Sequence, residues 1–447
     1  MTTSVGRNSG STATPTKATF SYWLKGSHDG TQQGIWGWHR GNDASNFWLG
    51  VYYSTNGSMY FNWKQTSLSV TLGTTQKFRD PTAWAHHVIA IDTTQGTAAD
   101  RVKWYIDGDR VTSFEDSLDT ISQNTTILNW SNSQDKMEIG TWYQASSARN
   151  LNNHCISHFH MTDGYVYDAS SFGSTDSTTG TWKINTVPNV TYGNEGGFWF
   201  KDDGALTDRS GAGNNFTLDQ GTLTTTQDNP SNNFAVINYL NPNAGENIAF
   251  SSGNTSINST GGAHRNAPAS IYLPLGNGKF YWEMKVDRMS THVKVGLVYD
   301  EWSKLNKPTP GEEHSGSNEG YAYRNDGQKE NNGTSSFGNS YTVNDIIGIA
   351  FDTENRKLYY SKNGTWQNSG DPTSGSTGTG AAFTVASGYT YAPIVNLYNA
   401  DVSFNFGNGF FGSTAIASEG TNASGLGKFE YDVPAGYTAI CTKGLNE

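Results

Sequence analysis

Only two cysteines occur among the 447 residues, Cys155 and Cys441. They are far apart in the sequence and cannot form the disulfide framework that stabilises small secreted domains, so the fold has to depend on buried side chains. Charge is scarce as well: Asp, Glu, Lys and Arg make up 15% of the chain, the net charge is −11, and Lys and Arg form no run. Binding to nucleic acid needs clustered basic residues, so we expect no nucleic-acid ligand.

Long apolar stretches are also missing. A membrane-spanning helix needs about 20 consecutive apolar residues, and no run of that kind occurs, so we expect no membrane insertion. Residues 1–19 are polar and lack the apolar segment of a secretory signal peptide. This predicts that the protein is made and folded in a cytoplasm.

Glycine and aromatic residues, by contrast, are abundant. Gly occurs 51 times, and Phe, Trp and Tyr make up 13% of the chain. Together with many Ser, Thr and Asn residues, this composition is typical of strands joined by polar loops, and it supplies enough apolar surface to exclude disorder. A chain of 447 residues has room for two or three domains, each with its own core.

Alternating patterns indicate where the strands lie. In Val102–Ile106 the Val, Trp and Ile side chains point to one face, and the Asp107-Gly108 pair that follows predicts a tight hairpin turn. Ile346–Phe351 is continuously apolar and predicts a strand covered on both faces. Helical periodicity is almost absent, so the sequence predicts an all-β fold of antiparallel strands, as in sandwiches and barrels.

The first half of the chain resembles the laminin-G and concanavalin A-like family. The resemblance depends on a strand pattern with Trp and His, then a strand that ends in Tyr-Ile-Asp-Gly, then two further strands. These motifs are Trp84–Asp92, Val102–Gly108, Met137–Gly140 and Ile156–Gly164. Residues 1–17 are short for such a fold, so we expect its usual opening strands to be missing or supplied elsewhere.

Residues 168–234, and the closing Val433–Cys441, are similar to segments of structural proteins from marine and other tailed phages. The similarity depends on a succession of short motifs rather than on one of them. In the first segment they are Ser171–Gly173, Thr181-Trp182, Tyr192-Gly193, Gly197-Phe198, Asp208–Gly211 and Asn229–Phe234.

The second half resembles a SPRY domain, because the strand motifs of that family follow one another in the expected order. They are Gly278–Glu283, Val295–Leu297, Gly320-Tyr321, Asp345–Asp352, Leu358–Gly364, Tyr391–Pro393 and Phe404–Gly407. The resemblances imply two antiparallel β-sandwich domains, a concanavalin-like one followed by a SPRY-like one. The predicted divisions are an N-terminal arm (1–17), a first domain (18–234, of which 202–234 is linker-like), a second domain (235–412) and a C-terminal segment (413–447).

Catalytic patterns are missing from both halves. Retaining glycosidases hold two carboxyl groups about 5 Å apart, and concanavalin-like glucanases carry them in an E-x-D-x-x-E motif that this sequence lacks. The nearest acidic cluster, Glu115–Asp119, has the wrong spacing, and neither a G-x-S-x-G motif nor a P-loop occurs. We therefore expect no enzymatic activity, and polysaccharide degradation is the least favoured alternative.

Metal sites are also weakly indicated. His154, His158 and His160 would share one face of a strand and could bind zinc, but Ile156 occupies the same face, and hydrogen bonding or stacking is the favoured interpretation. The laminin-G resemblance implies a calcium site, for which the aspartates in turns are candidates, although each also has a turn-forming explanation. These are Asp43, Asp107, Asp109 and Asp163. We expect no cofactor, with calcium left open.

Binding is the remaining class of function. Sugar recognition needs aromatic rings together with amides and charged groups on loops that a rigid sandwich holds in place. In the first half the candidates are Trp142, Tyr143, Arg149 and Asn152, expected in a loop after Met137–Gly140; in the second half they are Trp302, Tyr321, Tyr323 and Arg324, expected around the loop 301–319. The alternative is that these aromatic residues close the ends of the two cores.

The phage resemblance implies a surface protein of a virion, with other virion proteins as partners and a homo-oligomeric state. Within that class we favour attachment to a host surface or a carbohydrate, on an appendage of the tail or head. Capsid decoration without a receptor role is the alternative. SPRY domains in other settings bind peptides, so a host surface protein is a further candidate ligand.

Overall fold

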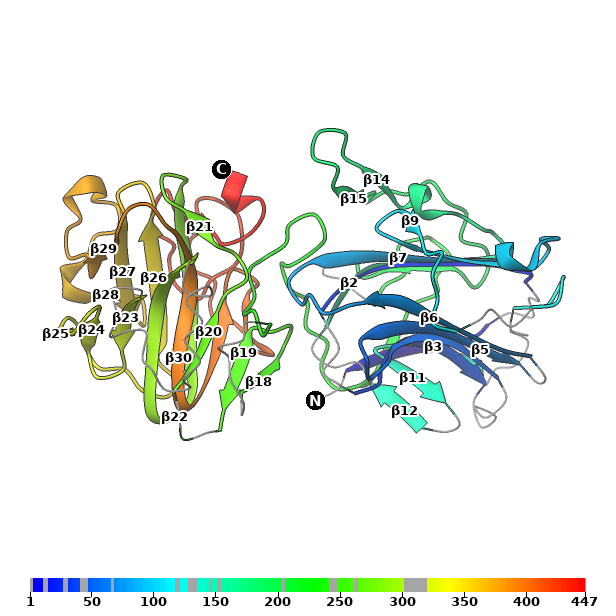
Figure 1. Ribbon diagram of the computed structural model, residues 1–447, viewed down its shortest axis with the longest axis horizontal. Coiled ribbons are helices and arrows are strands. Elements are labelled where there is room, and N and C mark those ends of the chain that lie inside the picture. Colours follow the sequence, from blue (N-terminus) through cyan, green and yellow to red (C-terminus); the bar gives the residue numbers. More distant parts are fainter. Residues whose placement is uncertain are drawn as a thin grey trace. The chain divides into compact units, whose positions relative to one another are not determined.

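The chain is described from a computed structural model (Figure 1). The structure describes residues 3–10, 15–26, 31–40, 47–65, 68–116, 121–127, 135–144, 147–150, 154–201, 206–240, 248–260, 262, 264–300 and 320–446. They form two compact units, Met1–Thr225 and Thr226–Glu447. The division between the units falls inside the segment that the sequence predicts to be linker-like.

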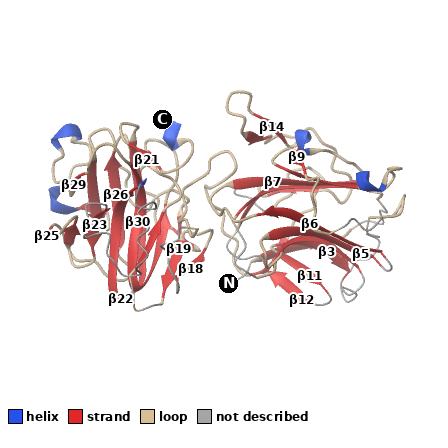
Figure 2. Cartoon of the chain, in the orientation of Figure 1, coloured by secondary structure: helices blue, strands red, loops and turns tan. Residues whose placement is uncertain are grey.

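Both units are built from strands, and the predicted all-β fold is confirmed (Figure 2). The strands pair antiparallel, except that the short β33 (Thr438–Ala439) lies parallel to β22 (Lys279–Tyr299). Helical turns in the described residues are limited to short 3-10 segments. These are η2 (Ala98–Asp100), η3 (Ala169–Ser171), η7 (Gln367–Ser369), η8 (Gly375–Thr377) and η9 (Gly444–Asn446).

The first unit consists of two sheets with a core between them. One sheet has the order β17 (Thr217–Gln220), β1 (Ser4–Asn8), β10 (Asp135–Ile139), β3 (Gln33–Arg40), β4 (Phe47–Tyr53), β5 (Ser58–Gln65) and β6 (Leu68–Lys77). The other has the order β16 (Gly197–Trp199), β13 (Cys155–Asp163), β2 (Lys17–Lys25), β7 (Trp84–Asp92), β8 (Val102–Ile106) and β9 (Asp109–Arg110). Trp36 of the first sheet stacks on Phe20 of the second, with ring centroids 4.3 Å apart, at the centre of this core.

Residues predicted to form an N-terminal arm contain a strand of the larger sheet. β1 pairs with β10 on one side and with β17 on the other. β17 itself comes from the segment that was predicted to be linker-like. One edge strand of this sheet, β17, and its neighbour β1 are therefore supplied by residues that carry too little apolar pattern to be recognised as strands.

The predicted hairpin at Asp107-Gly108 is present. Asp107 and Gly108 have φ values of 48° and 89°, and Tyr105 pairs with Arg110 across the turn. Positive φ at both central positions is the geometry that matches the twist of a two-stranded hairpin. The alternation predicted for Val102–Ile106 is confirmed as well, because Val102, Trp104 and Ile106 are buried.

The second unit contains one 14-stranded sheet that folds around its core. Its longest strands are β22 and β30 (Thr390–Asn405), which pair along most of their length. The remaining members are β18 (Ile248–Ser251), β19 (Ser256–Ser259), β20 (Arg265–Pro268), β21 (Leu273–Pro274), β23 (Gly320–Arg324), β24 (Gln328–Glu330), β25 (Thr334–Ser336), β26 (Ile346–Asp352), β27 (Lys357–Lys362), β28 (Thr365–Trp366), β29 (Phe383–Thr384) and β33. A separate pair is formed by β31 (Phe410–Phe411) and β32 (Thr414–Ala415).

The two opening strands predicted from the SPRY motifs belong to a single strand. β22 pairs with β26 through its first seven residues and with β23 through residues 294–298. Register shifts between Val286 and Arg288, and between Met289 and His292, lie between these two parts. Bulges of this kind bend a strand, so one strand contributes to both layers of the fold.

Each unit also has a segment that covers an outer face of a sheet. In the first unit, η3 and the hairpin β14 (Gly173–Thr175)–β15 (Trp182–Ile184) cover the six-stranded sheet, and β11 (Thr141–Gln144)–β12 (Ser147–Asn150) contacts β3 and β4 of the other sheet. In the second unit the C-terminal residues 429–441 cover Tyr281, Ala350 and Tyr359. The predicted double burial of Ile346–Phe351 is thereby confirmed.

Candidate functional site

Trp142 does not lie on an exposed loop. It belongs to β11, is 1% exposed and stacks on Tyr52, with ring centroids 4.4 Å apart. Gly50 makes room for the indole, since a Cβ atom there would lie 2.6 Å from Trp142 Cδ1. The expected rim loop is a hairpin, and its Trp packs on the sheet below.

The other candidates of the first half are less well described. Tyr143 and Arg149 lie in β11 and β12, and their side chains are outside the described part of the structure. Asn152, and Trp302 of the second half, are themselves outside the described residues. Their proposed ligand contacts stay predictions.

Tyr321, Tyr323 and Arg324 lie on β23, and the expected exposure of the two tyrosines has to be corrected. Tyr321 is 7% exposed and Tyr323 is fully buried in the core of the second unit, because alternate residues of a central strand face inward. Arg324 forms ion pairs with Asp326 and Glu330, at 3.0 and 2.9 Å. Tyr323 nevertheless supports a surface feature, since its hydroxyl donates a hydrogen bond to the carbonyl oxygen of Asn339.

The three histidines proposed as zinc ligands do not share a face. A bulge in β13 between Ser157 and His160 shifts the alternation of side chains by one residue. His154 therefore packs beside Tyr53 of the core, while His158 and His160 both pack against Phe198 outside it. His160 Nδ1 is also 3.0 Å from the Tyr192 hydroxyl. Stacking and hydrogen bonding explain these rings.

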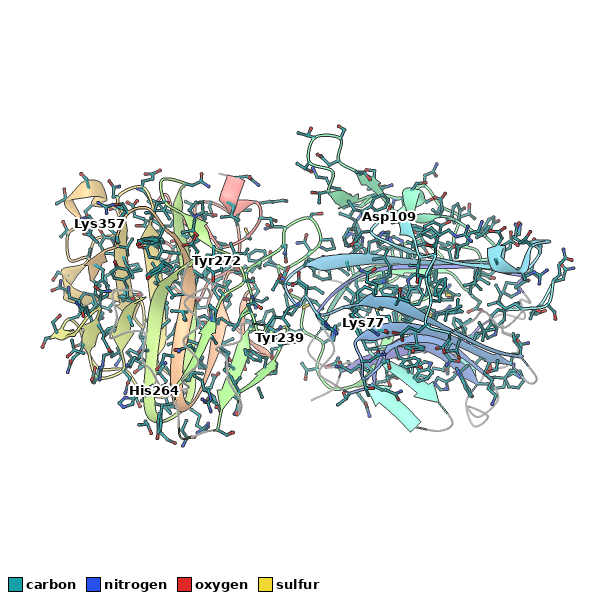
Figure 3. The ribbon with its side chains drawn as sticks, in the orientation of Figure 1. Lys77, Asp109, Tyr239, His264, Tyr272 and Lys357 are labelled. Carbon is teal, nitrogen blue, oxygen red and sulfur yellow. The ribbon has the colours of Figure 1, made fainter. Side chains whose placement is uncertain are left out.

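The aspartates considered for calcium are also dispersed. Asp107 accepts a hydrogen bond from the backbone N–H of His86, Asp163 accepts one from Glu195, and Asp109 lies exposed on β9 (Figure 3). Asp43 is outside the described residues. Within the described ranges, no group of three His, Cys, Asp or Glu side chains is arranged to hold a metal ion.

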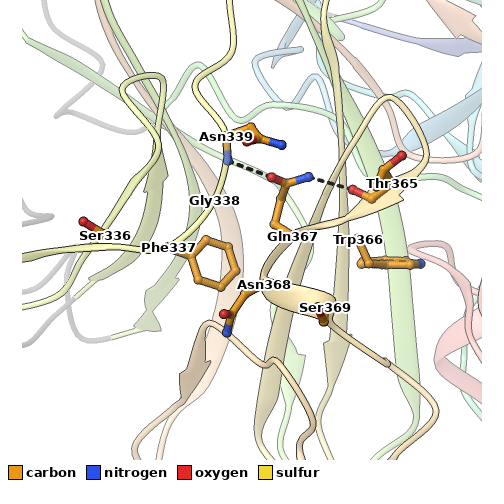
Figure 4. Close-up of a pocket in the computed structure, with 9 residues that line it drawn as sticks. All are labelled: Ser336, Phe337, Gly338, Asn339, Thr365, Trp366, Gln367, Asn368 and Ser369. Carbon is orange, nitrogen blue, oxygen red and sulfur yellow. Dashed lines mark hydrogen bonds between the residues drawn. The ribbon is translucent and has the colours of Figure 1, made fainter.

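A surface pocket of about 480 Å³, largely open to solvent, lies on the second unit between the end of β25 and the start of η7 (Figure 4). One wall is the segment 336–339, and the other is 365–369. The lining residues are Ser336, Phe337, Gly338, Asn339, Thr365, Trp366, Gln367, Asn368 and Ser369. None of them is titratable.

Gln367 holds the two walls together. Its Oε1 accepts a hydrogen bond of 2.8 Å from the backbone N–H of Asn339, and its Nε2 donates one of 2.8 Å to the carbonyl of Thr365 (Figure 4). Gln367 is 4% exposed, so its amide group bonds within the protein and does not face a ligand. The Tyr323 hydroxyl fixes the same wall from below through Asn339. The pocket is therefore preformed.

Asn368 and Ser369 line the pocket in an unusual backbone conformation. Their φ values are 52° and 53°, in the left-handed region that most side chains avoid. Strained backbone of this kind persists where the surroundings enforce it and is often found at binding sites. Both side chains are exposed, and Asn368 Nδ2 donates a long hydrogen bond of 3.5 Å to the carbonyl oxygen of Gly380.

The chemistry of the lining favours binding of uncharged groups. Phe337 and Trp366 are partly exposed aromatic residues, while Asn339 and Asn368 are exposed and carry amides. A nearby cation, Lys329 Nζ, lies 5.8 Å from the Phe337 ring, and burial lowers the pKa of this lysine. Without a carboxyl or imidazole in the lining, the pocket has no general acid or base, and nothing in the lining would activate the hydroxyl groups of Ser336, Thr365 and Ser369 as nucleophiles.

These pocket residues were not among the candidates chosen from the sequence. The Asn363-Gly364 turn was assigned only to a SPRY strand and its turn, and the Trp366 that follows it was not considered. The second wall is distant in sequence, and nothing in the segment 336–339 indicates that it meets 365–369. The aromatic residue just after a hairpin turn was the available signal.

Comparison with known proteins identifies the domain that carries this pocket. Residues 279–409 match the family model of the SPRY domain, so the C-terminal region of the chain contains a SPRY domain. The match includes all nine pocket residues, while the folded unit extends beyond it on both sides. No curated protein matches the chain.

Three solved structures are similar to parts of the chain. The SPRY domain of human HERC1 is 18% identical and covers 38% of this chain and 96% of its own, with a TM-score of 0.29. The TRIM65 PSpry domain is 11% identical and covers 38% and 88%, with a TM-score of 0.28. A heptameric SAP-like pentraxin from Limulus polyphemus is 12% identical and covers 37% and 72%, with a TM-score of 0.27.

In the part of the chain that the structure describes, no helix has the length and apolar character to cross a bilayer.

Proposed function

We propose that this protein is a non-enzymatic binding protein and that the pocket lined by 336–339 and 365–369 is its ligand contact. The observation that carries the proposal is the lining itself, which combines two partly exposed aromatic side chains, two exposed amides and no titratable group. Binding sites for neutral polar ligands have this composition. SPRY domains are in general protein-interaction domains, which supports binding rather than catalysis.

The biological setting that we propose is the surface of a tailed-phage virion, where the protein attaches to a host-cell surface. This part is supported by the similarity of residues 168–234 and 433–441 to phage structural proteins. A preformed neutral pocket suits attachment, because a rigid site loses little entropy on binding.

The test compares two substitutions of exposed, left-handed asparagines. Asn368→Gly removes the pocket amide while keeping a backbone that glycine adopts without strain. Asn344→Gly is the matched control, since Asn344 has a φ of 72° and lies outside the pocket. Both variants of the full chain are applied to a glycan array and to a displayed library of random peptides.

We expect wild type and Asn344→Gly to select the same ligands. Asn368→Gly should bind them about tenfold more weakly, the loss that accompanies removal of one well-placed hydrogen-bonding group. Unchanged binding by Asn368→Gly and by a second variant, Trp366→Ala, would contradict the proposal.

A further inference from the structure

A free sheet edge leads directly into the pocket. Within the part of the chain that the structure describes, β25 pairs with β24 alone, and it ends the path β30-β22-β23-β24-β25 at the margin of the sheet (Figure 1). Its last residue, Ser336, also lines the pocket. Strand edge and pocket therefore form one continuous surface.

The direction of the backbone groups on β25 follows from its pairing. Two backbone hydrogen bonds join β24 to β25 at the ends of this hairpin: Asn331 N–H donates to Gly333 O, and Phe337 N–H donates to Gly327 O. The backbone groups of these two residue pairs therefore point towards each other. Such pairs alternate with pairs that face outward, and Ser336 pairs with Gln328 at an outward position. Thr334 and Ser336 therefore present their N–H and C=O groups to solvent, about 7 Å apart along the strand.

Among the described residues, the shortness of β25 is the one feature that limits pairing at this edge. Thr334, Ser335 and Ser336 are all exposed and include no charged residue and no proline, the usual devices that prevent edge pairing. The edge strand β9 of the first unit differs, because it consists of the exposed, charged Asp109 and Arg110. β18, at the other end of the same path, also carries no charged residue and no proline, so β25 differs from it in that its last residue lines the pocket.

We propose that the ligand of this pocket is an extended peptide segment of a partner protein, which adds to β25 as a further strand and places an uncharged side chain between Phe337 and Trp366. This inference rests on the proposed function and names its ligand class. Two outward N–H groups and two outward C=O groups at a two-residue spacing match the repeat of another strand. A glycan has no matching repeat of donors and acceptors. Main-chain bonds supply affinity, and the pocket selects the side chain.

The test separates the backbone of Ser336 from its side chain. Ser336→Pro removes the outward N–H and leaves the bonds between β24 and β25, which are made by the alternate positions. Ser336→Ala keeps the N–H and is the matched control. Peptides selected from the displayed library on the full chain are synthesised, and their dissociation constants are measured by fluorescence polarisation.

We expect Ser336→Pro to weaken peptide binding about tenfold or more and Ser336→Ala to change it less than about twofold. Equal binding by the proline variant, with binding still lost in Asn368→Gly, would overturn strand addition while leaving the pocket as the site. Selection of glycans alone would have the same meaning. Failure of every ligand to respond to Asn368→Gly or Trp366→Ala would instead contradict the proposed function.

A second copy of this chain is the remaining occupant to exclude. Sedimentation of the full chain without peptide shows whether it self-associates. Self-association that Ser336→Pro abolishes would assign the edge to a second copy and overturn the assignment to a partner's peptide. An unchanged sedimentation coefficient in the variant supports the proposal.

Discussion

Both units bury polar side chains between a sheet and a segment that covers it, but the buried groups differ between the units. Each has a sheet whose outer face is covered by a further segment, and each cover seals polar groups beneath it. In the first unit these groups are histidines, and in the second unit the central one is a carboxyl group. Trp182 belongs to the cover of the first unit, whereas Phe337 and Trp366 of the second unit line the pocket; all three side chains are partly exposed.

His86 shows how the cover of the first unit depends on a neutral ring. Trp182 Nε1 donates a hydrogen bond of 3.0 Å to His86 Nδ1, and His86 Nε2 lies 2.8 Å from the Ser21 hydroxyl. A proton on Nδ1 would face the indole N–H and break the first bond. Burial, with His87 and His158 nearby, lowers the pKa of His86 to about 3. Burial also lowers the pKa of His87 to about 3 and that of His160 well below its usual value.

Glu283 has the corresponding place in the second unit. Its carboxyl accepts hydrogen bonds from the backbone N–H groups of Glu430 and Tyr431 in the C-terminal cover, at 3.0 and 2.9 Å. The Tyr281 hydroxyl and Asn405 Nδ2 donate two more. Burial raises the pKa of Glu283 to about 7, in spite of these bonds. Burial therefore lowers the pKa of the histidines in the first unit and raises the pKa of the carboxyl group in the second.

The largest expected effect is a difference in the pH dependence of the two units. Below pH 6.5 the unfolded chain binds protons at histidines that stay neutral in the folded first unit, so its stability falls on acidification. Between pH 6.5 and 5 this amounts to about 2 kcal/mol for each fully buried histidine. The folded second unit binds a proton at Glu283 that the unfolded chain releases above its usual pKa of 4.5, so this group acts in the opposite direction.

Scanning calorimetry of the full chain between pH 5 and 6.5 measures this difference. We expect the transition of the first unit to move to lower temperature at the lower pH and that of the second unit to hold or rise. If the transition temperatures of both units changed by the same amount between pH 6.5 and 5, the proposed difference in their pH dependence would be wrong.

A similarly specific effect is expected for Glu283→Ala. The substitution leaves four buried donors without an acceptor, which costs about 3–5 kcal/mol. Urea unfolding should show the loss in the second unit alone. Glu354→Ala is the control, since the side chain of Glu354 is 53% exposed and its removal should change stability by less than about 0.5 kcal/mol.

The contrast between the units could be predicted from the sequence only in part. The strand patterns at Val102–Ile106 and Ile346–Phe351 and the SPRY motifs led to the correct fold class, because alternation and strand order are local signals. Burial of Trp142 could not be predicted, since the space for its indole is made by Gly37 and Gly50 on two other strands. The bulge in β13 was also missed, and with it the opposite faces of His154 and His158. The pocket depends on contacts between distant segments.

Trp182→Ala tests the cover of the first unit. The indole fits against Gly108 and Gly173, where a Cβ atom would lie 2.5 and 2.6 Å from it, and it bonds His86. We expect the first unit to lose about 2 kcal/mol, less than for a fully buried Trp because Trp182 is partly exposed. Thermal unfolding measures the loss. Ligand binding should be unaffected, and weaker binding in this variant would move the site towards the first unit.

The smallest expected effect has the opposite sign. Both ring nitrogens of His87 are buried without a hydrogen-bond partner, and the ring stacks on Tyr22 with centroids 5.3 Å apart. His87→Phe should therefore stabilise the first unit by about 1 kcal/mol and reduce its acid sensitivity by one group. His86→Phe is the matched control and should destabilise, because both nitrogens of His86 have partners. Denaturant titrations at pH 5 and 7 distinguish these outcomes, and destabilisation by His87→Phe would show that its ring nitrogens are needed.

The division of roles, with binding in the second unit and packing in the first, is tested most directly by hydrogen–deuterium exchange of the full chain with and without its strongest selected ligand. We predict slower amide exchange in 334–339 and 365–369 and unchanged exchange in 141–144 and 173–184. Protection of the two segments of the first unit, without protection of the pocket walls, would contradict it.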